Sequence, residues 1–419
     1  MLSSDRVLFA TPSQCALETQ ATLVFGSERI QTALAAIYDL AEKQPQASLK
    51  SGSSTLRQAM QEIAFAYVLR NLNDDATTPK ILWDQNPPHV VDGVSIPGSR
   101  AIGNNPDNIY RRIPLSADEQ YCLRGKILGP VAADVRFSVL PHFSMQADWV
   151  QTTLALQDID IDSEGNFELD LTGHRSGGNN HVYLPPGTAR MTVRESLNNW
   201  AIDTPMYLQI SRQGENDARE FESDVIAKKL AAQMPAFVAH WLQFNNDTYY
   251  SRPSNVLPRA VKPPGGLTGQ ISVMGNYRLA PDEALIIRAK SLGANYFSFA
   301  VMDPWMRCAD YELRTTSLAL GQLTSDGDEI YEVVLALQDP GVHNWLDPGG
   351  LSEGALQVRW QGLAVRRRSA EELFEVQKTT LGELNSLLRD GTQWITPEQR
   401  AQQLAARKRA FDRRFSQRV

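Results

Sequence analysis

The spacing of hydrophobic residues separates helical segments from a β-rich middle. Apolar side chains recur three and four positions apart over Pro12–Ala41 and over Ser54–Leu72, which is the period of a helix with one buried face. The same period returns over Arg219–Asn245, where Pro235 interrupts it. We therefore expect helices at the start of the chain and a helical insertion between two β-rich parts.

Short apolar runs, bounded by turns rich in proline, glycine, asparagine and aspartate, fill the rest of the chain. Such runs at a spacing of about ten residues are typical of a β-sandwich or barrel. The expected strands before the insertion are Tyr121–Gly125, Val135–Leu140, Trp149–Leu156, Phe167–Leu171, Met191–Arg194 and Met206–Ile210. Those after it include Tyr296–Met302, Tyr331–Leu337 and Gly354–Trp360.

Together these patterns predict a mainly β protein with flanking helices. The β segments are expected to form a sandwich or barrel in two halves. We expect a helical N-terminal region (1–80), a first β half (81–215), a helical insertion and crossover (216–268), a second β half (269–365) and a C-terminal helical tail (366–419).

Several motifs occur in an order that resembles a bacterial family. The second β half contains DPWMRCADY, DPGVHNWLD and GALQVRW between Asp303 and Trp360. Upstream lie NNPDNIYRRIPLSADEQYCLRG (Asn104–Gly125) and LPPGTARMTVRESLNNW (Leu184–Trp200). Over about Asn104–Gly362 the chain resembles the family called domain of unknown function 1214. This resemblance implies a mostly antiparallel jelly-roll sandwich, and it implies no particular reaction.

Composition excludes several classes of protein. The chain has 41 Lys and Arg against 48 Asp and Glu, and this negative balance argues against a nucleic-acid partner. Its 3 cysteines, Cys15, Cys122 and Cys308, are widely spaced and odd in number, so we expect no disulfide framework and a reducing, cytoplasmic location. No apolar run reaches the roughly 18 residues of a membrane span. Dinucleotide, phosphate-loop and G-x-S-x-G motifs are missing, and we expect no cofactor.

The turn between the last two strands concentrates polar residues that could carry acid/base chemistry. A histidine beside a carboxylate can act as a general base near neutral pH, which makes His343 and Asp347 a candidate catalytic pair. Asp107, with Asn105, is a further candidate in the first β half. In the alternative interpretation, Asn344 and Asp347 only cap tight turns and Trp345 closes the end of the sandwich.

Three arginines beside expected strands form the candidate substrate clamp. Arg111, Arg194 and Arg359 could each hold a carboxylate, sulfate or phosphate through two hydrogen bonds, or could instead be buried against an acidic side chain. Aromatic residues could wall the same pocket. The complete candidate binding set is Arg111, Arg194, Arg359, Asn105, Tyr110, Trp305, Trp345 and Asn344.

Two further features allow more than one interpretation. His142, His174 and His181 could hold a metal ion only if three loops converge, and no metal-binding spacing supports this, so we predict no metal site. The basic C-terminal helix after Thr396 could join two subunits into a homodimer or pack on its own sandwich.

Two functions follow from these expectations. The first is an enzyme that acts on a small, partly apolar metabolite by acid/base chemistry, with the arginines indicating an anionic group. The second is a non-catalytic protein that binds a carbohydrate, a lipid-like ligand or a partner. Convergence of His343, a carboxylate and Arg111 on one pocket would favour the enzyme.

Overall fold

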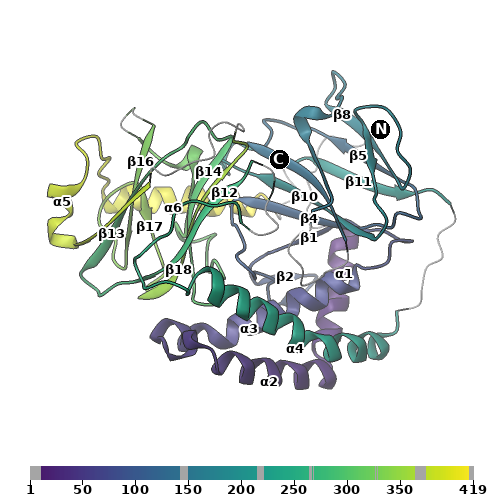
Figure 1. Ribbon diagram of the computed structural model, residues 1–419, viewed down its shortest axis with the longest axis horizontal. Coiled ribbons are helices and arrows are strands. Elements are labelled where there is room, and N and C mark those ends of the chain that lie inside the picture. Colours follow the sequence, from purple (N-terminus) through teal and green to yellow (C-terminus); the bar gives the residue numbers. More distant parts are fainter. Residues whose placement is uncertain are drawn as a thin grey trace.

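The structure is a computed structural model that describes residues 11–141, 150–214, 221–263, 267, 269–325, 327, 329–363 and 374–414. Figure 1 shows two β-rich halves side by side, with α2, α3 and α4 grouped along one side of both. The mainly β fold with flanking helices is confirmed. Within the described residues, no helix has the length and apolar character needed to cross a membrane.

Four helices cover the sandwiches, and their apolar faces form one core. They are α1 (Pro12–Phe25), α2 (Glu28–Glu42), α3 (Lys50–Leu72) and α4 (Ser223–Thr248). The expected continuous helix from Pro12 to Ala41 is wrong, because α1 ends at Phe25 and Ser27 begins α2. The amide of Gly26 donates to the carbonyl of Thr22, which closes the last turn of α1.

The first β half is a sandwich of two sheets. One sheet has the order β1 (Leu82–Asp84), β4 (Asn108–Pro114), β10 (Thr188–Ser196), β6 (Asp134–Pro141) and β7 (Thr152–Ala155). The other has the order β11 (Tyr207–Arg212), β5 (Tyr121–Lys126), β8 (Asn166–Thr172) and β9 (His181–Tyr183). A separate hairpin pairs β2 (His89–Val91) with β3 (Val94–Ile96). Ile109, Phe137 and Val193 from one sheet and Leu123 and Leu169 from the other meet in the core.

The second β half repeats this arrangement. One sheet has the order β12 (Ile271–Arg278), β18 (Glu353–Gln361), β14 (Tyr296–Met302) and β15 (Ser317–Ala319). The other has the order β17 (Trp345–Leu346), β16 (Ile330–Ala336), β13 (Glu283–Lys290) and β19 (Phe374–Thr380). All strand pairs of the two sandwiches are antiparallel except β8 with β9 and β16 with β17.

The C-terminal region is less helical than expected. Phe374–Thr380 forms β19 and pairs with β13, because Phe374 and Val376 alternate toward the core of the second half. The capping sequence at Ser369 lies outside the described residues. Among the residues of this region that the structure describes, the α-helices are the short α5 (Leu384–Leu387) and α6 (Pro397–Asp412).

Helix α6 packs on its own chain. Arg407 donates to the carbonyl of Tyr311 at 2.6 Å and to the hydroxyl of Ser317 at 2.9 Å. Ala410 and Phe411 join the core of the first half. One face of α6, with Arg400, Arg407, Ala410 and Phe411, is therefore packed on the protein's own chain.

Buried charges attach α3 to both halves. Glu62 on α3 accepts hydrogen bonds from Arg100 at 2.7 and 2.8 Å and from Arg307 at 2.7 Å. Arg307 also pairs with Asp303 at 2.8 Å, within the motif DPWMR. All four side chains are buried. The motif that gave the family resemblance thus fixes α3 on the second sandwich.

Side chains alternate between the two faces of a strand, and this determines which of them point away from the sandwich core. On β10, Met191 and Val193 face the core, so Arg190, Thr192 and Arg194 lie on the opposite face. The arginine-bearing face of β10 is turned toward the helices.

Candidate functional site

A large cavity lies where the outer face of the β4–β10–β6 sheet meets α3, α4, β12 and β18. Its volume is about 900 Å³, which is ample for a small metabolite. The strands contribute Arg112, Arg190, Arg194 and Arg359 to the lining, and α4 contributes Phe237, Trp241 and Phe244 together with the basic Lys229. The lining residues include Tyr67, Arg70, Asp74, Tyr110, Arg112, Ser138, Arg190, Thr192, Arg194, Phe237, His240, Trp241, Phe244, Tyr249, Met274, Gln357 and Arg359.

Two arginines from different halves of the protein lie in this lining. Arg194 comes from β10 and Arg359 from β18. The guanidinium carbon of Arg194 lies 5.5 Å from the centre of the Tyr110 ring, and Arg359 donates to Gln357 at 2.9 Å. The Nε atoms of both arginines are buried without a hydrogen-bond partner, and within the described residues neither arginine has an ion-paired carboxylate. Burial lowers the pKa of Arg194.

A second basic group lies further along the same sheet. The Oδ2 atom of Asp84 accepts from the Nε atoms of Arg70 and Arg112, each at 2.6 Å. Arg190 donates to the carbonyl of Pro141 at 3.3 Å and has no ion pair among the described residues. Burial and repulsion from Arg112 and Arg70 lower the pKa of Arg190 to about 10. An unneutralised positive charge therefore remains at this end as well.

Aromatic side chains of α4 form the opposite wall. Phe237, Trp241 and Phe244 are three and four residues apart, so they share one face of the helix. Their rings contact one another, with centroids 6.3 Å apart for Phe237 and Trp241 and 5.3 Å apart for Trp241 and Phe244. Tyr67 of α3 packs on Phe237 at 4.7 Å. This wall suits an apolar or aromatic part of a ligand.

The structure places Tyr110, Arg194 and Arg359 at this cavity, and it places Arg111 elsewhere. Arg111 shares the inward face of β4 with Ile109 and Ile113, and it pairs with Glu195 at 2.5 Å inside the sandwich. The expectation that Arg111 clamps a substrate is therefore wrong. Its neighbour on the opposite face of β4, Arg112, lines the cavity instead.

His343 and Asp347 form no hydrogen bond with each other, and neither lines the cavity. His343 lies 3.3 Å from the carbonyl of Gln322, and its own amide donates to Gln393 at 2.8 Å. Asp347 accepts from the amide of Gly349 at 2.8 Å and from Arg314 at 3.0 Å. The predicted acid/base pair is thus wrong, because both side chains hold turns at the far end of the second sandwich.

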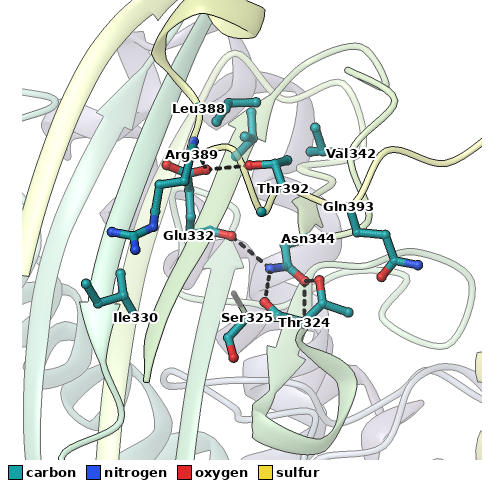
Figure 2. A pocket seen from close by; sticks show the side chains of 12 residues that line it. Thr324, Ser325, Ile330, Glu332, Val342, Asn344, Leu388, Arg389, Thr392 and Gln393 are labelled. Atoms are coloured by element: carbon teal, nitrogen blue, oxygen red, sulfur yellow. Dashed lines mark hydrogen bonds between the residues drawn. The ribbon is translucent and has the colours of Figure 1, made fainter. Parts of the chain in front are cut away.

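Figure 2 shows the small pocket beside this turn. Its volume of about 20 Å³ has room for a water molecule and for nothing larger. Asn344 donates to the carbonyls of Thr324 at 2.8 Å and Glu332 at 2.9 Å, as the dashed lines mark. The indole of Trp345 donates to Ala336 at 3.0 Å. The substrate-binding roles expected for Asn344 and Trp345 are therefore wrong, and both residues stabilise the end of the sandwich.

The remaining candidates are buried between structural elements. Asp107 accepts hydrogen bonds from Trp200 at 2.9 Å, Tyr296 at 2.9 Å and Ser317 at 3.1 Å, and burial raises its pKa. Asn105 donates to the same Tyr296 hydroxyl at 2.8 Å. The indole of Trp305 donates to the carbonyl of Gly52 on α3 at 2.9 Å. None of the three candidates lines the cavity, so their expected site roles are corrected to structural ones.

The predicted histidine loop holds no metal cluster among the described residues. The rings of His174 and His181 lie 6.4 Å apart, and His181 Nε2 is 2.9 Å from the hydroxyl of Thr172. His142 lies outside the described residues.

Sequence reasoning missed Arg70, Arg112 and Arg190. One signal was available: arginine and threonine alternate as Arg190, Thr192 and Arg194 along an expected strand, which places these polar groups on one face. No pattern in the sequence showed that α3 and α4 would cover that face.

The pKa of His343 leads to a testable pH dependence. Burial and the nearby charge of Arg400 lower this pKa below its usual value of about 6.5. A lowered folded-state pKa contributes stability above the unfolded-state pKa, and this stability is lost as the pH falls through the folded-state pKa. We expect His343→Gln to lose less stability than the wild type between about pH 7 and about pH 5. Urea denaturation at a series of pH values measures this, and equal losses would contradict it.

Comparison with known proteins supports the fold alone. No family model and no curated protein matches the chain. The crystal structure of an uncharacterised protein from Burkholderia cenocepacia matches with a TM-score of 0.70 and 19% sequence identity, covering 87% of this chain and 100% of that chain. A crystal structure from Vibrio parahaemolyticus matches with a TM-score of 0.39 and 10% identity, covering 66% of this chain and 90% of that chain. The Burkholderia structure shows that a bacterial protein shares this architecture.

Proposed function

We propose that the protein binds a small, partly apolar anion in the cavity between the β4–β10–β6 sheet and α4. One observation carries the proposal: Arg194 and Arg359 line the same cavity, have buried Nε atoms without partners, and have no ion-paired carboxylate among the described residues. A buried charge is costly unless an opposite charge compensates it. A carboxylate or phosphate bound between the two guanidinium groups would supply that compensation.

The aromatic wall supports the apolar part of the proposal. Phe237, Trp241 and Phe244 face the arginines across the cavity, so a ligand could bury a hydrocarbon or aromatic group while its anion binds the arginines. The acid/base reaction expected from His343 and Asp347 is not included, because both residues lie outside the lining. Binding is therefore the function that we propose, with the metabolite as the expected partner.

We also propose that the chain belongs to the family called domain of unknown function 1214. The ordered motifs from Asn104 to Gly362 support this membership. A cytoplasmic location is likewise proposed, and it is supported by the three free cysteines.

Thermal denaturation with named probes tests the binding proposal. The probes are decanoate, phenylacetate and decyl phosphate, with decanol as the uncharged control. We expect an anionic probe to raise the melting temperature of the wild type, by mass action on the folded state. Arg194→Met and Arg359→Met should each remove this effect. Without a probe, both variants should melt close to the wild-type temperature, since neither substitution breaks an ion pair among the described residues.

Arg124→Met is the matched control. Arg124 is an exposed arginine of β5, paired with Glu168 on the surface and absent from the cavity lining. This variant should keep the full response to the anionic probe. The proposal fails if no anion stabilises the wild type, or if decanol stabilises it as strongly as decanoate does.

A further inference from the structure

Strand β10 presents positive charge at two separate places along the cavity. Arg190, Thr192 and Arg194 lie on the same face and all line the cavity. The Cα atoms of residues four apart on a strand are about 13 Å from each other. The two arginines therefore enter the cavity well apart, and Thr192 lies between them.

The group around Arg190 has more positive than negative charge. Arg70, Arg112 and Arg190 line this end, and Asp84 is shared by Arg70 and Arg112. Asp74 lines the cavity at this end and attracts Arg190, so two carboxylates face three arginines here. Arg190 has a buried Nε atom without a hydrogen-bond partner, and within the described part of the chain its guanidinium donates to the carbonyl of Pro141.

A ligand with a single anionic group can compensate only one of these two places. If that group binds Arg194 and Arg359, Arg190 stays half-buried, with its Nε atom buried and with no ion pair among the described residues. We propose that the ligand carries two anionic groups, one bound by Arg194 and Arg359 and the other by Arg190. This inference rests on the proposed function and specifies its ligand as an elongated dianion.

The space between the two arginines suits a partly apolar linker. Thr192 and Ser138 form its floor, and the hydroxyl of Thr192 is buried without a hydrogen-bond partner. Phe237 and Trp241 of α4 lie on the opposite wall. A chain with a mainly hydrocarbon middle and one polar group could use both surfaces.

Calorimetric titration with chain-length series tests the inference. The dianionic probes are succinate, adipate, suberate and sebacate, and octanoate and decanoate are the monoanions matched to the last two. The alkane bisphosphonate that matches suberate distinguishes carboxylate from phosphate-type recognition. We expect suberate or sebacate to bind wild type about 10- to 100-fold more tightly than the matched monoanion, as one added charged hydrogen-bond pair would give. Succinate is too short to reach both arginines.

Arg190→Met separates this inference from the proposed function. This substitution should lower the affinity for the longer dianions to that for the matched monoanions, and it should leave the affinity for the monoanions unchanged. Arg194→Met should lower the affinity for both classes. If Arg190→Met leaves the advantage of the dianions intact, or if the dianions have no advantage, the second anionic group is refuted and single-anion binding stands. If no anion of either class binds, both the inference and the proposed function fail.

Discussion

Replacing Glu62 by glutamine is expected to lower the free energy of unfolding by about 3–5 kcal/mol. Glu62 is fully buried and neutralises both Arg100 and Arg307. Glutamine has nearly the same shape, but among the described residues it leaves Arg307 paired with Asp303 and Arg100 paired with the exposed Asp310 at 3.8 Å. Urea denaturation followed by tryptophan fluorescence measures the change.

Glu168→Gln is the control for this substitution. Glu168 pairs with Arg124 at 2.7 Å, but both side chains are 52% exposed. Exposed pairs contribute about 0–1 kcal/mol, so this variant should unfold almost as the wild type does. Similar losses in the two variants would show that the buried network contributes no more than a surface pair.

Removing Glu195 alone should destabilise the protein by about 3–5 kcal/mol, and removing Arg111 with it should restore much of that loss. Both side chains are buried inside the first sandwich, 2.5 Å apart. Glu195→Leu leaves the Arg111 charge in an apolar core, whereas Arg111→Met with Glu195→Leu leaves no charge there. A double-mutant cycle by urea denaturation measures the coupling.

The same variants test where Arg111 acts. A folded Arg111→Met protein should bind the anionic probes as the wild type does, because Arg111 faces the sandwich core. Additive losses in the cycle would contradict the buried pair. If a folded Arg111→Met protein no longer binds the probes, Arg111 contributes to ligand binding after all.

Much of the fold could be predicted because local periodicity reflects burial. The alternating aromatic and small residues of Tyr296–Met302 form β14 at those bounds. The helical period over Ser54–Leu72 lies within α3. Two predictions were wrong for different reasons. A helix predicted from the apolar spacing ends before Gly26, which is a local effect. Phe374–Thr380 is a strand because it pairs with β13, which is distant in sequence.

The site was predictable only in part. The sequence of a strand indicates which face a side chain lies on, but it does not indicate which other element packs against that face. The alternation of side chains along β4 could be derived from the sequence. Ile109 and Ile113 lie on the inward face, and Arg111 lies on the same face, whereas Arg112 lies on the opposite one. That Arg194 and Arg359 meet depends on how two sandwiches pack, which no local spacing encodes. The polar turn around His343 drew attention because tight turns and catalytic loops use the same residue types.

The cavity belongs to neither sandwich alone, and this has a consequence for how its ligand preference can change. Its charged floor comes from strands whose other faces form the two cores, whereas its aromatic wall comes from α4, an insertion between the halves. Phe237 and Trp241 of that face pack in the helical core and in neither β core, so substitutions there alter the shape offered to a ligand while both β cores keep their contacts. We expect homologues with this architecture to diversify in the inserted helix, keeping the basic floor as a common anchor for chemically different molecules.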